Sequence, residues 1–308
     1  MRIGIVTPAY NVAPYIGDAI RSVLAQTHGD WTMTIIDDGS GDETAAIAAG
    51  FGDPRIRLIR QRNAGVSAAR NRGVIATQAD AILFLDADDW LSPDALVTLE
   101  TALRSDTAAI AAVGPYRRVG PDAGHRVVRP RGGDLLKALL VRNLFANGGH
   151  LLIRRPMLRA VGPFHPGLRY GEDWEYWTRL ARLGWFAATG TRAPLLFVRE
   201  RADGACRGMA ANPASFAPCM DAIHGARALL SRFSEAELAR FRRRAEAEND
   251  WIVGRELIRH GRRAEGRTFL RRSVRAAPCA RRMLLLAAGS LPLKSIGPFR
   301  LYPPAEAV

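Results

Sequence analysis

The stretch that most constrains this chain is residues 81–90, in which five apolar residues run directly into three aspartates. An apolar run of this length without alternation is typical of a strand that is buried on both faces of a sheet. Such a strand presents Asp86, Asp88 and Asp89 at its carboxyl end, where ligands bind in open α/β sheets. Mg²⁺ or Mn²⁺ suits that place, because these ions bind one or two carboxylates and complete their shell with water and phosphate oxygens. An acidic surface turn is the alternative that this stretch alone leaves open.

Strand-like and helix-like patterns alternate around that run from residue 3 to residue 113. This βαβα order predicts an α/β fold with a mostly parallel sheet and helices on both of its faces. The Ser-Pro-Asp sequence at residues 92–94 is a strong helix start, with an N-cap and a proline in the first turn. The expected strands cover residues 3–7, 32–36, 55–59, 81–85 and 108–113, and the expected helices begin near residues 14, 43, 65 and 92.

After residue 113 the pattern is less regular, and it becomes helical from residue 218 onward. Turn-rich residues 116–131 predict a hairpin or a loop. We expect one α/β domain over residues 1–215 and a basic helical appendage over residues 216–308. The further candidates are strands at residues 150–153, 185–188 and 195–198, and helices at residues 156–161, 172–183, 221–232, 235–260 and 264–276.

The net charge of +14 comes almost wholly from arginine, since Lys137 and Lys294 are the only lysines. Much of the charge lies after residue 220, where arginines occur in pairs and triplets. A basic surface attracts nucleic acid, anionic lipid or phosphorylated substrates about equally well, so charge indicates these three classes without choosing among them. Because the sequence has no zinc, helix-turn-helix or aromatic RNA-binding signature, we expect no nucleic-acid partner.

The cysteines and the apolar stretches bear on the compartment. Cys206, Cys219 and Cys279 are widely spaced, which favours neither a disulfide framework nor a zinc site. The apolar run at the amino terminus is too short for a signal peptide, and the run at residues 283–293 is too short to span a bilayer. We therefore expect a cytoplasmic protein.

Four polar clusters fall where the expected sheet has strand ends or crevice loops. Together they offer an aromatic ring to lie against a nucleobase, carboxylates to bind the nucleobase and the ribose, an arginine to bind phosphate, and a metal ligand. This combination predicts a nucleoside-diphosphate site. Each cluster taken alone is also typical of turns or solvated helix residues, but their joint occurrence at successive strand ends favours the site. The clusters are Thr7, Pro8, Tyr10 and Asn11; Asp37 and Asp38; Arg70; and Asp86, Ala87, Asp88 and Asp89.

Five segments resemble, in order and spacing, the motifs of the family 2 glycosyltransferases, which are inverting sugar transferases with the GT-A fold. They are residues 7–11, 37–40, 63–71, 85–90 and 171–175. The resemblance covers residues 1 to about 200, and so implies that residues 1–215 are a catalytic domain. It also implies a nucleotide-diphosphate sugar donor, Mn²⁺ or Mg²⁺, and a glycan or lipid-linked acceptor. Synthesis of a cell-surface polysaccharide or glycoconjugate is the expected setting.

The resemblance also implies roles for individual residues. Tyr10 and Asp38 would hold the base, Asp86 the ribose and Asp88 the metal, while Asp173 would be the catalytic base. Arg199 and Arg201 would reach the diphosphate, and a surface ion pair with Glu200 is the alternative to that role. Their segment departs from the family, since Gly204 and Cys206 replace small hydroxyl residues. The other residues that the resemblance assigns to the donor are Thr7, Pro8, Asn11, Asn63, Arg70, Ala87 and Glu172.

The chemistry of transfer fits one carboxylate in the role of base. A nucleoside diphosphate leaves readily once a cation and an arginine neutralise it, so the carboxylate needs only to accept the proton of the attacking hydroxyl. Asp173 begins an expected helix beside Trp174 and Trp177, which can desolvate it, although acidic residues at helix starts are also common. Two other classes stay open, a nucleotide-sugar-binding protein without transferase activity and a basic nucleic-acid-binding protein.

The basic tail has two interpretations. The apolar faces of helices 246–260 and 264–276 are more simply explained by packing on the domain or on a second subunit. Residues 271–301 combine arginines with leucines and fit peripheral contact with an anionic membrane. The expected location is therefore the cytoplasm, with possible attachment to the inner face of the cell membrane.

Overall fold

A computed structural model of the chain describes residues 1–120, 125–201, 213–279 and 282–283. The chain forms two compact units. The first comprises Met1–Leu135 and Leu144–Glu200, and the second comprises Leu136–Asn143 and the described residues from Arg201 onward. The domain boundary expected at residue 215 stays a prediction.

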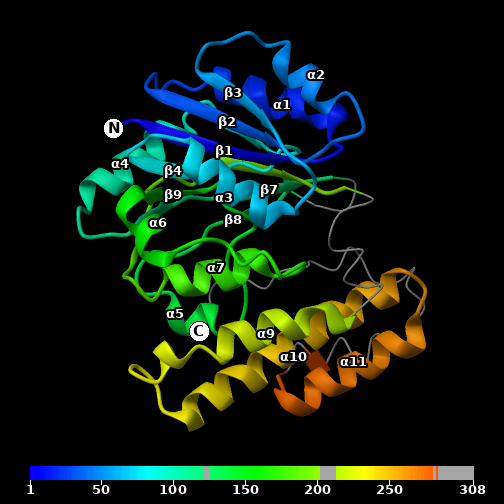
Figure 1. Ribbon diagram of the computed structural model, residues 1–308. Coiled ribbons are helices and arrows are strands. Elements are labelled where there is room, and N and C mark those ends of the chain that lie inside the picture. The colour runs from blue at the N-terminus through cyan, green and yellow to red at the C-terminus, as the bar shows by residue number, and fades with distance from the viewer. Residues whose placement is uncertain (121–124, 202–212, 280–281, 284–308) are drawn as a thin grey trace. The chain divides into compact units, whose positions relative to one another are not determined.

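The first unit is built on a seven-stranded sheet (Figure 1). Its strands are β1 (Ile3–Ala9), β2 (Trp31–Asp37), β3 (Ile56–Arg60), β4 (Ala81–Phe84), β6 (Ala111–Val113), β9 (Leu151–Arg154) and β10 (Phe186–Ala188), in the order β10-β6-β9-β4-β1-β2-β3. β1 pairs in parallel with β2 and β4, β2 with β3, and β6 with β10. β9 runs antiparallel to both β4 and β6. The predicted mostly parallel α/β fold is therefore confirmed, with β9 as the exception to its direction.

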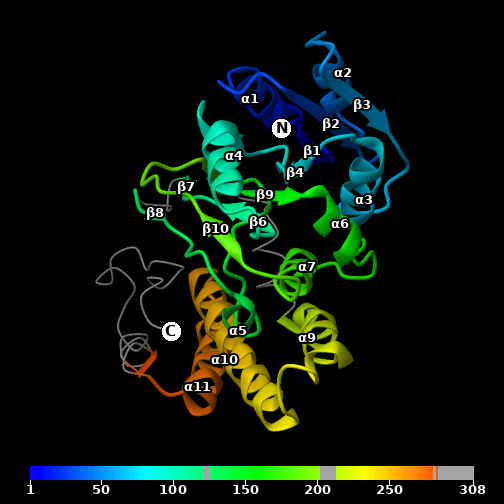
Figure 2. The same cartoon turned by 90° about the vertical axis from the view of Figure 1, so that its left-hand side faces the viewer.

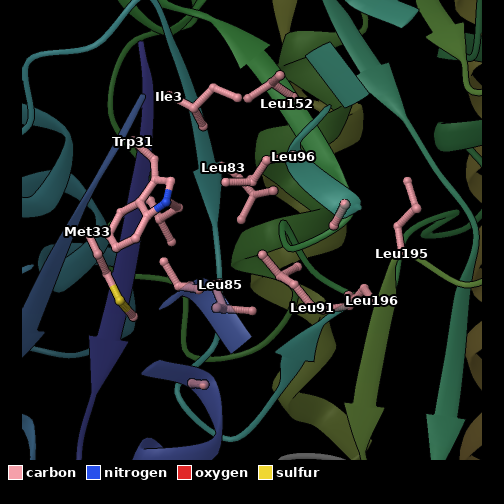
Figure 3. Close-up of a cluster of buried hydrophobic side chains, with 14 of the residues drawn as sticks. Ile3, Trp31, Met33, Leu83, Leu85, Leu91, Leu96, Leu152, Leu195 and Leu196 are labelled. Atoms are coloured by element: carbon pink, nitrogen blue, oxygen red, sulfur yellow. The ribbon is translucent and has the colours of Figure 1, made fainter. Parts of the chain in front are cut away.

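Helices cover both faces of this sheet (Figure 2). One face carries α1 (Ala13–Leu24), α2 (Thr44–Ala49) and α4 (Ala95–Ser105), and the other carries α3 (Val66–Ala76), α6 (Arg155–Val161) and α7 (Glu172–Leu180). On the first face Ile3, Met33 and Leu83 belong to the main buried core, in which Leu83 lies against Leu96 of α4 (Figure 3). Because side chains alternate along a strand, the residues between them face α3 and α7.

Helix α3 approaches the sheet closely at Gly73. A Cβ atom built on Gly73 would lie 2.2 Å from Cγ1 of Val6 on β1, so no larger residue fits without displacement. The sequence pattern predicts a helix through Gly73, although glycine costs about 1 kcal/mol relative to alanine inside a helix. The close approach to β1 explains why the chain accepts that cost.

Gly73→Ala should therefore destabilise the first unit by about 1–3 kcal/mol, because overpacking outweighs the helix propensity of alanine. Urea unfolding followed by circular dichroism measures the effect. Gly29→Ala is the matched control, since a Cβ atom there meets no atom within 4 Å. Adding Val6→Ala should recover part of the loss, and an unchanged stability of the single variant would contradict the packing argument.

A second, four-stranded sheet begins directly after the acidic turn. Its strands are β5 (Trp90–Leu91), β7 (Tyr116–Val119), β8 (Val127–Val128) and β11 (Leu196–Arg199), in the order β5-β11-β7-β8. β7 and β8 pair antiparallel, so the hairpin expected within residues 116–131 is present. β5 was not predicted, because two residues are too few to give a periodic pattern. One face of this sheet carries Leu91, Leu196 and Tyr116 into the main core.

The second unit is helical. It contains α5 (Leu136–Leu139), η1 (Pro213–Phe216), α9 (Ala217–His224), η2 (Arg227–Leu229), α10 (Glu235–Arg259) and α11 (Arg263–Ala276). The predicted helix over residues 221–232 is wrong, because α9 ends before Gly225 and Ala226 adopts an extended conformation. Helices α10 and α11 have nearly the predicted bounds, and the N-cap of α10 is a capping box formed by Ser234 and Glu237. Within the described residues no helix is both long and apolar enough to cross a bilayer.

Helices α10 and α11 pack against each other through a pair of glycines. A Cβ atom on Gly254 would lie 2.8 Å from the carbonyl oxygen of Gly266, so the two backbones touch at this point. Arg272 Nη2 donates to Asp250 Oδ1 at 2.6 Å beside the crossing. Trp251 of α10 and Leu270 of α11 are buried, so these apolar faces pack within the unit. Most of the expected membrane segment, residues 271–301, lies outside the described residues.

Candidate active site

The acidic turn follows β4 at the carboxyl end of the parallel strands. Leu85 N donates to the carbonyl of Val6 at 3.0 Å, and Asp89 N donates to the carbonyl of Asp86 at 3.1 Å, which closes the turn. Asp86 and Asp88 are half-buried, whereas Asp89 is buried. The turn thus leaves two carboxylates accessible at the sheet edge and turns the third inward.

Asp89 is held by two hydrogen-bond donors. Its Oδ1 accepts from the backbone N–H of Arg199 at 2.8 Å, and its Oδ2 accepts from Asn147 Nδ2. The orientation of the Asn147 amide is fixed, because its Oδ1 accepts from Gly149 N at 2.8 Å. Burial raises the pKa of Asp89 well above its usual range, the nearby charges of Asp86 and Asp88 raise it further, and the two donors act in the opposite direction.

Arg199 connects the turn to α1. Its Nε donates to the carbonyl oxygen of Asp88 at 3.0 Å, and its Nη2 donates to Asp18 Oδ2 at 2.7 Å. Its guanidinium also lies over the ring of Trp90, 4.8 Å from the centroid. Within the described residues Nη1 makes no hydrogen bond, so it is the part of Arg199 that could reach a diphosphate. Arg201 is the first residue of the second unit, and it is half-buried there.

Arg70 joins the acidic turn to the start of α7. Its Nη2 donates to Asp86 Oδ1 at 3.0 Å and its Nη1 donates to Glu172 Oε1 at 3.1 Å, with the side chain 5% exposed. Burial by itself would lower the pKa of Arg70, but the charges of Asp86, Glu172 and Asp173 more than compensate and raise it. Its buried Nε has no hydrogen-bond partner in the described part of the chain. Arg70 is therefore a fixed cation among three carboxylates.

The amino end of α7 is fixed by an amide and by stacked rings. Asn71 accepts a hydrogen bond from Phe164 N at 2.7 Å and donates one to its carbonyl at 2.9 Å. The Phe164 ring stacks on Tyr176 of α7 with centroids 3.7 Å apart. Asp173 is half-buried at this helix end, and its Oδ1 accepts from Trp174 N at 2.7 Å. Trp174 and Trp177 are both buried, so their rings belong to the core and do not form a platform for a sugar.

Tyr10 and Asn11 lie after β1, where the chain turns into α1. The Tyr10 ring is 51% exposed, which leaves it accessible to a ligand. Asn11 has a positive φ of 50°, a conformation that asparagine tolerates better than most residues, and its Oδ1 accepts from Gly41 N at 2.9 Å. Pro8 is half-buried, and the buried hydroxyl of Thr7 has no hydrogen-bond partner within the described residues.

Asp38 holds the loop that precedes α3. Its Oδ1 accepts from Gln61 Nε2 at 2.6 Å and from Ala64 N at 2.9 Å, and its Oδ2 accepts from Gly65 N at 2.8 Å. Oδ2 therefore has capacity for one more donor, such as the imide N–H of a base. Asn63 is exposed on the same loop. Both aspartates of the pair are buried, and the preceding Asp37 pairs with Arg60 at 2.9 Å.

The structure brings the predicted residues after β1, β2 and β4 to the ends of neighbouring strands, and Arg70 of α3 links Asp86 to Glu172 of α7. Asn147 and Asp18 were not predicted, because they lie outside the motifs. Within the described ranges no three His, Cys, Asp or Glu side chains are arranged to hold a metal. The hollow of about 690 Å³ between α4 and β10 is lined by Thr98, Trp185 and their neighbours, and none of the predicted site residues borders it.

Exchanging the partners of Asp89 tests the hydrogen-bond network. In Asp89→Asn an amide N–H must face a donor, and in Asn147→Asp two carboxylates meet, so each single variant should lose about 1–3 kcal/mol of unfolding free energy. In the double variant Asp89→Asn/Asn147→Asp each donor again faces an acceptor, because the new aspartate accepts from Gly149 N and from the new asparagine. Urea unfolding should show recovery of most of the loss. Additive losses in the double variant would contradict the assigned network.

A model of the family described as Glycosyl transferase family 2 matches residues 4–162 of this chain. That range includes the acidic turn, Arg70 and Asp38, but not Asp173 or Arg199.

Curated relatives match over part of their length. The chain is 32% identical over 183 residues to the uncharacterized glycosyltransferase EpsJ of Bacillus subtilis, covering 56% of this chain and 53% of that protein. It is 38% identical over 97 residues to the putative teichuronic acid biosynthesis glycosyltransferase TuaG of the same organism, covering 30% of this chain and 38% of that protein. The matches thus span about half or less of the relatives' own length.

Two solved structures share the fold. Staphylococcus aureus TarS 1-349 in complex with UDP superposes with a TM-score of 0.62 and 15% identity, over 94% of this chain and 87% of that one. The mannosyltransferase PcManGT from Pyrobaculum calidifontis, in complex with GDP-Man and Mn²⁺, gives a TM-score of 0.57 and 18% identity, over 94% and 79%. At these identities the likeness concerns the fold and not the substrate.

Proposed function

This chain belongs to glycosyl transferase family 2, and from that premise we propose that it transfers a sugar from a nucleoside-diphosphate sugar to an acceptor hydroxyl, with inversion at the anomeric carbon. The observation that carries the proposal is the position of Arg70 between Asp86 on the acidic turn and Glu172 at the start of α7. The charge of Asp173, the next residue after Glu172, acts on the same guanidinium, which supports a position for Asp173 near the proposed diphosphate site. The proposed site of the nucleotide-sugar donor and the proposed proton acceptor therefore lie at the same edge of the sheet.

The donor would lie across the ends of β1, β2 and β4. Tyr10 offers an exposed ring to the base, and Asp38 offers the remaining acceptor capacity of Oδ2 to a base N–H. Asp86, half-buried and paired with Arg70, is suited to accept a ribose hydroxyl. Thr7, Pro8, Asn11, Asn63 and Ala87 would complete this wall of the site. The complexes of TarS with UDP and of PcManGT with GDP-Man support a nucleotide-containing donor for this chain.

The residues fit a divalent cation that arrives with the donor. Asp88 is the accessible carboxylate of the turn that is not bound by Arg70, whereas both oxygens of Asp89 already accept hydrogen bonds. One protein carboxylate with diphosphate oxygens and water is an ordinary shell for Mg²⁺ or Mn²⁺. When bound, the cation would neutralise charge on the leaving diphosphate. The Mn²⁺ complex of PcManGT supports this reading.

Asp173 would accept the proton of the acceptor hydroxyl. Asp173 is half-buried at the amino end of α7. The position of this helix is fixed by Phe164, which is hydrogen-bonded to Asn71 and stacks on Tyr176 of α7. Glu172 is bound to Arg70 and would hold this cation on the phosphate side, while the next residue, Asp173, is half-buried. Proton transfer to a positioned carboxylate lets the acceptor oxygen attack opposite the departing diphosphate.

The biological setting is also a proposal. The likeness to the putative teichuronic acid biosynthesis glycosyltransferase TuaG supports polysaccharide synthesis for this chain. A glycan or lipid-linked acceptor at the cytoplasmic face of the membrane fits that setting. Contact of residues 271–301 with an anionic membrane remains part of the proposal.

Asp88→Asn should lower turnover by roughly a hundredfold or more, because the amide is a weaker ligand for the cation. Sugar release is measured across a panel of nucleotide sugars with Mn²⁺, and nucleotide affinity is measured with and without EDTA. Asp94→Asn, an exposed aspartate on the same segment, is the matched control. Undiminished transfer by the variant, or by the wild type in EDTA, would show that no cation acts through Asp88.

Asp173→Asn should lower turnover by roughly a hundredfold to ten-thousandfold with little change in donor affinity, since the amide is nearly isosteric but cannot accept a proton. Donor affinity is measured by calorimetry with the nucleotide sugar that the panel identifies. A variant that loses donor binding as strongly as turnover would assign Asp173 to donor positioning instead.

A further inference from the structure

One face of the four-stranded sheet continues outward from the acidic turn. Trp90 of β5 is paired with Phe197 of β11, and Phe197 is paired with Arg117 of β7. Directly paired residues lie on the same face of a sheet, and this face is opposite the one that enters the core. All three side chains are half-buried. Because Trp90 comes directly after Asp89, the row leads from the expected cation site across the sheet.

The row consists of two stacked rings with a guanidinium group at each end. Trp90 and Phe197 stack with centroids 5.4 Å apart and planes 6° apart. The guanidinium of Arg117 lies 5.0 Å from the centroid of Phe197, and that of Arg199 lies 4.8 Å from the centroid of Trp90. The rings are therefore engaged with each other and with the cations, so they serve to orient the arginines.

Within the described residues Arg117 differs from Arg70, Arg118 and Arg199 in having no acidic partner. Arg70 and Arg199 are bound to carboxylates, and Arg118 lies 3.9 Å from Glu200. In the part of the chain that the structure describes, the guanidinium of Arg117 has the ring contact with Phe197 and neither a hydrogen bond nor an ion pair. A half-buried, oriented cation with all its N–H groups available is suited to an external anion.

The hairpin around Arg117 is basic. Arg117 pairs with Val127 of the edge strand β8, and three exposed arginines, Arg126, Arg129 and Arg131, flank or follow that strand. Charged residues on an edge strand also prevent edge-to-edge association, which accounts for exposed arginines in general. It does not account for Arg117, which is on an inner strand and is held in place by a ring.

We infer that Arg117, supported by the flanking arginines, binds an anionic group of the acceptor, a carboxylate or a phosphate. This inference rests on the proposed transferase function and names the chemical class of its acceptor. Two strand spacings separate Trp90 from Arg117, which amounts to about 10 Å and is about the length of two sugar rings. An acceptor that reaches from the acidic turn to Arg117 would therefore carry its charge within about two sugar units of the turn.

The test measures binding of matched probes to the full-length protein without donor or metal, so that its result does not depend on transfer. One pair is 4-nitrophenyl glucuronide and 4-nitrophenyl glucoside, and the other is glucose 6-phosphate and glucose, followed by saturation-transfer NMR at low salt. Arg117→Gln should weaken binding of the charged member of at least one pair by roughly tenfold and leave the neutral member unchanged. Arg117→Lys should give an intermediate loss, because it keeps the charge but not the fork of donors.

Arg57→Gln is the matched control, since Arg57 is an exposed arginine on the other sheet's edge strand β3 and its loss changes the net charge equally. Preference for the charged probe that disappears only in the Arg117 variants supports the inference. Equal effects of Arg57→Gln and Arg117→Gln, or none in either, would overturn it. Reduced flotation of Arg117→Gln with phosphatidylglycerol vesicles, without any change in probe binding, would assign the surface to a membrane instead.

Discussion

Mutual repulsion among the three carboxylates after β4 is the constraint on which the rest of the first unit depends. Two unit charges about 5 Å apart repel by about 3 kcal/mol at an effective dielectric constant of about 20. The fold balances that repulsion differently at each aspartate. Asp86 receives the guanidinium of Arg70, and Asp89 receives two neutral N–H donors. Asp88, the middle carboxylate, is half-buried, and its part in binding a cation stays a proposal.

The balancing groups also give the site its shape. Arg70 comes from α3 and binds both the acidic turn and α7. One side chain therefore sets the distance between the turn, where the sugar donor is proposed to bind, and Asp173, the proposed catalytic base. Arg199 comes from β11 and reaches both the turn and α1. Each arginine thus links two structural elements in addition to supplying a positive charge. Both arginines are therefore held by carboxylates of other elements, Arg70 by Asp86 and Glu172 and Arg199 by Asp18.

The sequence predicts the parallel sheet and the acidic turn well, because buried strands and their carboxyl-end polar residues have a local pattern. Arg70, Asp86 and Asp88 could be chosen from motifs that lie within short segments. Asn147 could not, since its role depends on the amide of Gly149 and on a carboxylate 58 residues away. The helix expected over residues 221–232 failed for a local reason, because Gly225 interrupts a pattern whose apolar periodicity continues past it.

The sequence separation within the Asp89 network has a consequence for how the chain folds. Arg199 N meets Asp89 Oδ1 across 110 residues, and Asn147 lies between them in the chain. Contacts of such long range close slowly, and they cannot form before the later segment has been synthesised. The strands β1, β2 and β4 can therefore pair while the inward-facing carboxylate still lacks both of its donors. Completion of the acidic turn is then a late event, and an incomplete chain that ends before β11 would hold a formed sheet beside an unbalanced cluster of negative charge.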